Sequence, residues 1–438
     1  MQDLENNQKQ SNMQKVALTA VAGTSIEWYD FFLYGAAAAL IFPTAFFGEM
    51  PPTTALLLSL LTFAAGFIAR PIGGIIFGHF GDKVGRKKTL ISALMLMGIS
   101  STLIGLLPTY AMIGVAAPIL LTSLRFAQGL AIGGQWGGAM LLVTESAPSN
   151  QRGYYGAFAQ AGAPIGVILA NLALIITSAL VSEEFFNTWG WRIPFLASAV
   201  LILISMYIQL NLEDTDAFKA LVNNKGIQSD ENIKKSPVIE AIKKYPKRIF
   251  LAAGAFLSVQ VTFYILIAFM LAYGVTSANM ARDDMLAAVL IASAIMVPIQ
   301  FVFSSYSDRH GRKGIFMLGA VLTGIWAFAI FPLVDTGNFY LIVLAITGGL
   351  VFLAMMYGPQ AAFFTELFST EVRYSGATLG YQFGAIVGGA FAPTIAVKLW
   401  TEFDIIWVSA YIALASLLTL ISVMALTETY QSDLNNTD

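Results

Sequence analysis

The few charged side chains within the long apolar runs of this chain could bind a proton and an organic anion. Glu27 and Asp30 lie three residues apart in one run, and Arg125 lies in another. An ionisable group is costly in an apolar medium, so it usually marks a path for ions or substrates. Two neighbouring carboxyl groups cannot both ionise easily there, so one should hold a proton near neutral pH. We expect proton coupling at Glu27 or Asp30, with the choice open, and anion binding at Arg125.

Helical spacing places these groups on two polar faces. Glu27, Asp30 and Tyr34 fall at positions i, i+3 and i+7, which share one side of a helix, and Arg125 and Gln128 begin a second polar stripe. Two interpretations remain open. In one, Arg125 and its polar neighbours hold a substrate carboxylate. In the other, a permanent Asp30–Arg125 ion pair only stabilises the helices.

The apolar runs of the second half carry glutamine and tyrosine where the first half carries charge. Such side chains offer hydrogen bonds and ring surfaces, which suit a hydroxylated carboxylate, although they also serve as hydrogen-bonding contacts between helices. With Tyr34 and Gln128, the expected substrate-binding residues besides Arg125 are Gln135, Trp136, Gln260, Tyr264, Tyr357, Tyr381 and Gln382.

A short charged turn occurs twice, which indicates an internal repeat. Asp82 and Arg86 in the first copy correspond to Asp308 and Arg312 in the second, 226 residues later. A second pair of matching positions, Glu145 with Arg152 and Glu366 with Arg373, recurs after 221 residues. Repeats of this kind indicate a duplicated architecture.

These turns and pairs could clamp neighbouring helices through charge-assisted hydrogen bonds, so we expect them to gate access. The alternative is that their basic residues only fix the membrane topology. Arg70 lies within three helical turns of the first copy and is a further gating candidate. Alternatively, its side chain extends to the membrane–water interface or pairs with Asp82.

The elements that must position these residues are membrane helices. Hydrophobic residues make up 57% of the 438 and charged residues 11%, whereas soluble domains carry about 25% charged residues. Twelve apolar runs are long enough to cross a bilayer. They lie near 16–42, 54–79, 88–107, 113–143, 153–180, 192–211, 249–274, 284–306, 314–333, 339–365, 374–399 and 404–426. We therefore expect an all-α integral membrane protein with six helices in each repeat.

Charge distribution predicts the domains and the orientation. The expected organisation is a tail at 1–15, a bundle at 16–211, a polar linker at 212–248, a second bundle at 249–426 and a tail at 427–438. The tails, the linker and alternate loops hold 19 of the 24 Lys and Arg residues. Because basic loops stay inside, both termini should be cytoplasmic.

Several segments resemble the major facilitator superfamily, in particular its metabolite:proton symporter branch. The similar segments are 23–35, 78–88, 125–138 and 189–195. Segments 237–241, 373–376 and 380–382 are most similar to transporters of shikimate and related metabolites in the bacterial inner membrane. The resemblance implies two six-helix bundles around a central cavity, alternating access, and symport of a proton with a small organic anion such as shikimate or another mono- or dicarboxylate.

Gln135 departs from that branch, which usually has glutamate at this position. Glutamine cannot titrate, so this chain is coupled through Glu27 or Asp30 alone, is an uncoupled facilitator, or is altered at this position to hold one conformation.

The sequence lacks the residues that enzymes and metal-binding proteins usually need. The absence of cysteine and the presence of only two histidines exclude the usual metal clusters and catalytic sets, so we expect no enzyme, metal or cofactor. The net charge of −2 gives no sign of nucleic-acid binding, and we expect a monomer in the bilayer. The remaining alternative is a drug or metabolite:proton antiporter, which the arginine at 125 disfavours.

Overall fold

The computed structural model describes residues 2–84, 86–133, 140, 143, 144, 147–213, 237–369 and 372–430. It describes only the backbone, without side chains, of residues 2–12, 15, 16, 19, 78–84, 86, 87, 90, 208–213, 237–240 and 374. Everything that follows concerns these parts of the chain.

The described residues form twelve long helical spans, which confirms the predicted fold class. The first six are α1 (Gln2–Leu40), α3 (Pro52–Val84), α4 (Arg86–Leu106), α6 (Ala116–Gly133), α8 (Arg152–Leu180) and α10 (Arg192–Glu213). Short elements between them are α2 (Phe42–Phe47), α5 (Tyr110–Ile113), η1 (Ser149–Gln151), α9 (Glu183–Phe185) and η2 (Phe186–Gly190).

The second six spans include two that change helical geometry partway. The seventh runs through α13 (Pro246–Ala255), α14 (Leu257–Tyr264), the π-helical η3 (Ile265–Phe269) and α15 (Met270–Thr276). The eleventh runs through α19 (Arg373–Gly384), the π-helical η4 (Ala385–Ala390) and α20 (Ala392–Glu402). The others are α16 (Arg282–His310), α17 (Arg312–Val334), α18 (Phe339–Glu366) and α21 (Ile405–Ala425), and the short α12 (Pro237–Lys244) precedes them.

Helix boundaries differ most from the sequence estimate at two places. Helix α1 begins at Gln2, so backbone expected as a tail continues the first span. The expected linker at 212–248 contains α12, and α13 begins within it at Pro246. Polar residues do not end a helix by themselves, because helix-compatible residues such as Gln, Glu and Lys prolong it without an apolar face.

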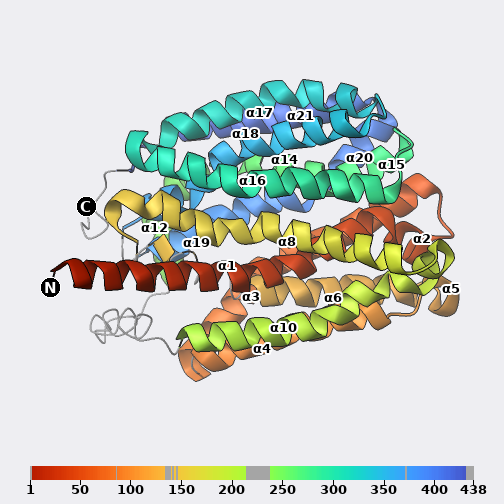
Figure 1. Ribbon diagram of the computed structural model, residues 1–438, viewed down its shortest axis with the longest axis horizontal. Helices are drawn as coiled ribbons and strands as arrows, with labels where there is room; N and C mark the ends of the chain where they lie inside the picture. Colours follow the sequence, from red (N-terminus) through yellow and green to blue (C-terminus); the bar gives the residue numbers. More distant parts are fainter. Residues whose placement is uncertain are drawn as a thin grey trace.

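The two halves lie side by side, and α8 of the first packs along α16 of the second (Figure 1). Helix α1 begins at the same end of the molecule as the chain finishes (Figure 1), and we name this the terminal end and the other the far end. Among the described helices, nine spans are long and apolar enough to cross a membrane, and α9 and η2 together with α10 form a bent tenth.

A close glycine contact fixes α3 against α6. A Cβ atom at Gly129 would lie 2.1 Å from the carbonyl oxygen of Gly66, so only glycine allows the two backbones to approach this closely. The contact brings Arg70 of α3 and Arg125 of α6 to the same region of the core, where both side chains are almost fully buried.

Candidate functional site

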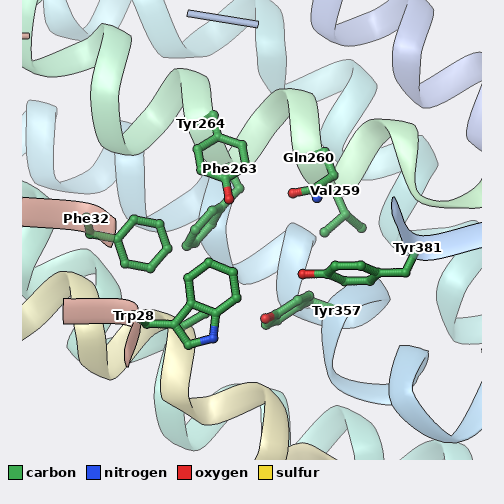
Figure 2. Close-up of a pocket in the computed structure, with 9 residues that line it drawn as sticks. Trp28, Phe32, Val259, Gln260, Phe263, Tyr264, Tyr357 and Tyr381 are labelled. Atoms are coloured by element: carbon green, nitrogen blue, oxygen red, sulfur yellow. The ribbon is translucent and has the colours of Figure 1, made fainter. Parts of the chain in front are cut away.

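Aromatic rings nearly fill the centre of the molecule between the two halves. A cavity of about 10 Å³, which holds roughly one water molecule, remains there. Figure 2 shows Trp28 and Phe32 of α1 facing Phe263, Tyr264, Tyr357 and Tyr381 of the second half across it, with Gln260 beside them. The rings leave no space for an organic acid, so this conformation is occluded.

Arg125 lies behind this aromatic layer and not at the cavity wall. Its guanidinium carbon is 4.2 Å from the ring centre of Phe31, 4.3 Å from that of Tyr34 and 4.7 Å from that of Phe63. These rings offer their negative faces to the cation. Tyr34 is itself held by a 2.6 Å hydrogen bond to Thr62.

The Arg125 guanidinium has one edge without a protein partner. Its Nη1 donates to Gln128 Oε1 at 3.1 Å, whereas Nε and Nη2 have no hydrogen-bond acceptor within the described residues. Gln128 Nε2 in turn donates to Ser101 Oγ at 2.7 Å. The Nε–Nη2 edge is the donor pair that a carboxylate binds with both oxygens.

Arg70 stacks on the same aromatic layer. Its guanidinium carbon is 4.4 Å from the ring centre of Phe31 and 4.4 Å from that of Phe67, and its Nε and Nη2 also lack acceptors in the described structure. The gating role expected for Arg70 stays a prediction, and its pairing with Asp82 falls on a side chain outside the described ones.

Asp30 is buried and hydrogen-bonded to Ser198 of α10. No Lys or Arg nitrogen of the described residues lies within ion-pair distance of it, so the Asp30–Arg125 ion pair considered from the sequence is absent from this conformation. Glu27 is only partly buried and has an interaction of its own. Of the two acids, Asp30 therefore lies deeper in the bundle.

Four of the predicted residues in the second half line the cavity. They are Gln260, Tyr264, Tyr357 and Tyr381. Gln260 Nε2 and Gln382 Oε1 are buried without hydrogen-bond partners in the described structure, so both keep a polar atom for a ligand or water. The ring of Tyr264 also packs against Phe67 at 5.1 Å, which links the cavity wall to the layer in front of the arginines.

A buried charge cluster at the terminal end joins the second charged turn to α18. Arg312 Nη1 contacts Asp308 Oδ1 at 2.6 Å, and its Nη2 contacts Glu366 Oε1 at 3.1 Å. Arg152 Nη1 lies 4.0 Å from the same Glu366 oxygen. The sequence predicted these four residues as gating residues, and the structure places them together.

The same cluster connects the two halves. Asp308 Oδ1 accepts a hydrogen bond from the backbone N–H of Gly153 at 2.8 Å, and Oδ2 accepts one from that of Tyr154 at 2.8 Å. These N–H groups belong to the first turn of α8, where a carboxylate satisfies donors that have no partner within the helix. Asp308 on α16 thus caps a helix of the other half.

The far end has its own contacts between the halves. Ser178 of α8 donates to Asp283 Oδ2 of α16 at 2.7 Å, and Asn171 donates to the Leu286 carbonyl at 3.2 Å. Arg282 lies over the ring of Phe186 with its guanidinium carbon 4.0 Å from the ring centre. Helices α8 and α16 are therefore connected at both ends, in agreement with an occluded state.

Some predicted residues lie outside the description. Gln135, Trp136 and Glu145 are not among the described residues, and neither are the side chains of Asp82 and Arg86. Arg373 is buried, and its Nε donates to the Phe368 carbonyl at 3.2 Å. Glu366, which the repeat matches with Arg373 in sequence, is bound by Arg312 and Thr429.

Sequence reasoning missed the residues that support the site. Ser101, Ser198 and Phe31 act through contacts to helices distant in sequence, and serine or phenylalanine in an apolar run carries no distinctive pattern. Glu428 was also missed: its carboxylate accepts hydrogen bonds from the backbone N–H groups of Arg312 and Lys313, both at 2.9 Å. Its position just after the last apolar run was the signal that could have found it.

The described residues form twelve helical spans, with two buried arginines that have no ion-pair partner among these residues and with a charge cluster at the terminal end, which is the architecture of a secondary transporter. The family model of the Major Facilitator Superfamily matches residues 20–379, and the chain belongs to this superfamily. The predicted family is thereby confirmed.

Two relatives from Escherichia coli K12 cover nearly the whole chain. The inner membrane metabolite transport protein YhjE is 39% identical over 97% of this chain and 96% of its own length. The shikimate transporter is 37% identical over 92% of both. A partially occluded inward-open structure of the xylose transporter XylE from E. coli is similar in fold, with a TM-score of 0.71, 17% identity, and coverage of 97% of this chain and all of that one.

The chain is therefore a metabolite transporter and not an enzyme, as predicted, and a multi-pass protein of the inner membrane. Its substrate and its coupling ion require a separate argument.

Proposed function

We propose that the chain carries a small organic anion together with a proton by alternating access. The single observation that supports this best is the Nε–Nη2 edge of Arg125, which is buried without an acceptor among the described residues. Leaving a buried cation unpaired is costly, so the edge should be filled in another state of the transport cycle. A carboxylate fills it with two hydrogen bonds.

The ring-lined cavity supports a cyclic or hydroxylated carboxylate. Its walls combine aromatic faces with the hydroxyl groups of three tyrosines and the free amide nitrogen of Gln260. Shikimate, which the relative at 37% identity transports by name, carries one carboxylate, three hydroxyls and a six-membered ring. We therefore take shikimate as the first substrate to test.

Asp30 is the proposed proton site. A buried carboxyl with no cation of the described residues at ion-pair distance can bind and release a proton without breaking an ion pair, and the Arg125 charge still acts on it. Glu27 remains the second candidate. The terminal end is the proposed cytoplasmic side, with the Asp308–Arg312–Glu366 cluster as its gate.

Access to Arg125 requires the aromatic layer to move. Phe31 contacts both arginines and packs 6.1 Å from Tyr264, so movement of Tyr264 away from α1 would open a path from the cavity to the guanidinium. Tyr264 ends α14 and precedes the π-helical η3, a geometry that often marks functional positions in helices.

Proteoliposomes with labelled shikimate test the proposal in two steps. Counterflow without a proton gradient should show exchange, and an inward proton gradient should then drive accumulation that a protonophore abolishes. Exchange without any response to the gradient would identify the chain as an uncoupled facilitator. Gln135→Glu, tested in parallel, would show whether a glutamate at position 135 restores coupling. Exchange of organic cations in place of acids would identify the antiporter alternative.

A further inference from the structure

Arg70 has the same donor edge as Arg125, and the proposed function leaves that edge unused. The Arg70 side chain belongs to a residue that is only 1% exposed, and its Nε and Nη2 have no hydrogen-bond acceptor among the described residues. Leaving a buried guanidinium edge unpaired is costly, so this edge needs a partner in some state of the transport cycle.

The two guanidinium groups lie close to each other beside α3. Gly66 and Arg70 are one helical turn apart on this helix, and Arg125 lies against Gly66, where an added Cβ atom would meet its Nε at 2.7 Å. The ring centre of Phe31 is 4.4 Å from the guanidinium carbon of Arg70 and 4.2 Å from that of Arg125. The two carbons are therefore no farther apart than the sum of these distances, which a small molecule with an acidic group at each end can span.

One tyrosine packs against the rings that cover both groups. The ring centre of Phe63 is 4.7 Å from the guanidinium carbon of Arg125, and that of Phe67 is 4.4 Å from the guanidinium carbon of Arg70. The ring centre of Tyr264 lies 5.6 Å from that of Phe63 and 5.1 Å from that of Phe67. Tyr264 comes from the second half and lines the central cavity (Figure 2). Its movement would therefore open a path from the cavity to both guanidinium groups.

We propose that Arg70 and Arg125 form a two-point anion site, so that the transporter favours substrates with two carboxylate groups. This inference rests on the proposed function, because it takes the Arg125 edge as the site of one carboxylate. A dicarboxylate would place one group on each Nε–Nη2 edge and neutralise both buried cations. Shikimate has one carboxylate and would leave one of the two edges without an anion.

The positive charge of the site requires that the second group be acidic. Two guanidinium groups this close repel each other, and the repulsion is stronger in a buried site than in water. A hydroxyl or an amide on the substrate could accept hydrogen bonds from Arg70 but would leave its charge in place. The second group of the substrate should therefore be a carboxylate and not a hydroxyl.

A comparison of each dicarboxylate with its own half-amide isolates the effect of the second charge. The probes are succinate, glutarate and adipate, which differ in the distance between their carboxylates. Their equilibrium binding to the purified full-length protein is measured at a pH above the second pKa of each acid. At least one dicarboxylate should bind at least about tenfold more tightly than its half-amide, because only the dicarboxylate fills both edges with anions. Equal binding of acid and half-amide across the series would overturn the two-point site.

Arg70→Gln should reduce this preference to within about twofold, while the affinity for the half-amide changes little because Arg125 is intact. Arg70→Lys keeps the charge without the paired donors, should reduce the preference at least about threefold, and serves as the second variant where Arg70→Gln folds poorly.

Arg192→Gln is the matched control. Arg192 is also a buried arginine of the first half, but its Nη1 and Nη2 donate to the Thr188 and Leu107 carbonyls. Its substitution should leave the preference unchanged. Equal losses in Arg70→Gln and Arg192→Gln would overturn the assignment of the second carboxylate to Arg70.

Transport assays separate this inference from the proposed function. Counterflow and proton-driven accumulation of labelled shikimate test the proposed function without any dicarboxylate. Proton-driven shikimate uptake by a protein that binds dicarboxylates no better than half-amides would overturn the two-point site alone. A dicarboxylate preference that depends on Arg70, in a protein without proton-driven uptake, would support the two-point site and overturn symport. Exchange of organic cations with no binding of any acid would overturn both.

Discussion

At the scale of single residues, the site depends on arginine and not on positive charge in general. Arg125 divides its donors between Gln128 and an edge without an acceptor among the described residues, and three aromatic rings surround its planar group. A lysine ammonium is compact and strongly hydrated, and it can neither stack in this way nor present two parallel donors.

We therefore expect Arg125→Lys to weaken substrate binding by on the order of 2–5 kcal/mol despite the conserved charge. Equilibrium binding of labelled shikimate to purified protein measures this directly. The matched control is Lys398→Arg at an exposed position of α20, which should bind as the wild type does. Unchanged affinity in Arg125→Lys would show that the carboxylate binds elsewhere, with Arg70 the next candidate.

Gly66 is the second residue on which the guanidinium depends. A Cβ atom at this position would lie 2.7 Å from Arg125 Nε, so Gly66→Ala should displace the free edge and reduce shikimate counterflow at least tenfold. Gly314→Ala is the control, because a Cβ atom there meets nothing within 4 Å. Wild-type counterflow in Gly66→Ala would mean that the guanidinium moves without loss of binding.

At the scale of elements, α8 and α16 are joined by different chemistry at their two ends. Asp308 caps α8 at the terminal end, and Asp283 accepts from Ser178 at the far end. An equilibrium between conformers responds only to contacts that differ between them. The two carboxylates should therefore bias access in opposite directions.

We expect Asp308→Asn to increase cytoplasmic labelling and Asp283→Ala to increase periplasmic labelling of a cysteine placed at Ala163, which lines the cavity. The natural chain has no cysteine, so the reporter is unique. A difference of about 1.4 kcal/mol changes the ratio of the two states tenfold. Asp284→Ala removes the acid next to Asp283 and should label as the wild type does. Equal labelling in all three variants would show that neither contact controls which side of the membrane the cavity faces.

At the scale of the whole molecule, the two halves must move as bodies. The interface is closed at both ends of α8 and α16 and contains a cavity of only about 10 Å³. Substrate can therefore enter or leave only if one end of the interface separates while each half keeps its own packing.

Cross-linking distinguishes movement between the halves from movement within one. A short cross-link between cysteines at Ser178 and Asp283 should abolish counterflow, and reduction of the cross-link should restore it. A cross-link within one half, between cysteines at Ser258 and Ser416, whose hydroxyls are 2.9 Å apart, should leave counterflow intact. Transport that survives the first cross-link would contradict rigid-body alternation of α8 and α16.

The sequence by itself determined the class of protein, the twelve spans and the short set of buried charges. Bilayer thickness fixes the length of a spanning helix, and the cost of intramembrane charge makes Asp30 and Arg125 conspicuous, so both can be read without a structure. The doubled turn likewise indicated a cluster around Asp308 and Arg312.

Only the tertiary structure decided which groups meet. Helices that are apolar on most sides give no pattern from which a partner face can be read, so the aromatic layer in front of Arg125 was not predictable. Asp308 binds Gly153, which is 155 residues away in the other half, and Ser101 lies 27 residues from Gln128 on a different helix. Such contacts depend on how the spans rotate and cross, which is set by packing at positions such as Gly66 and Gly129.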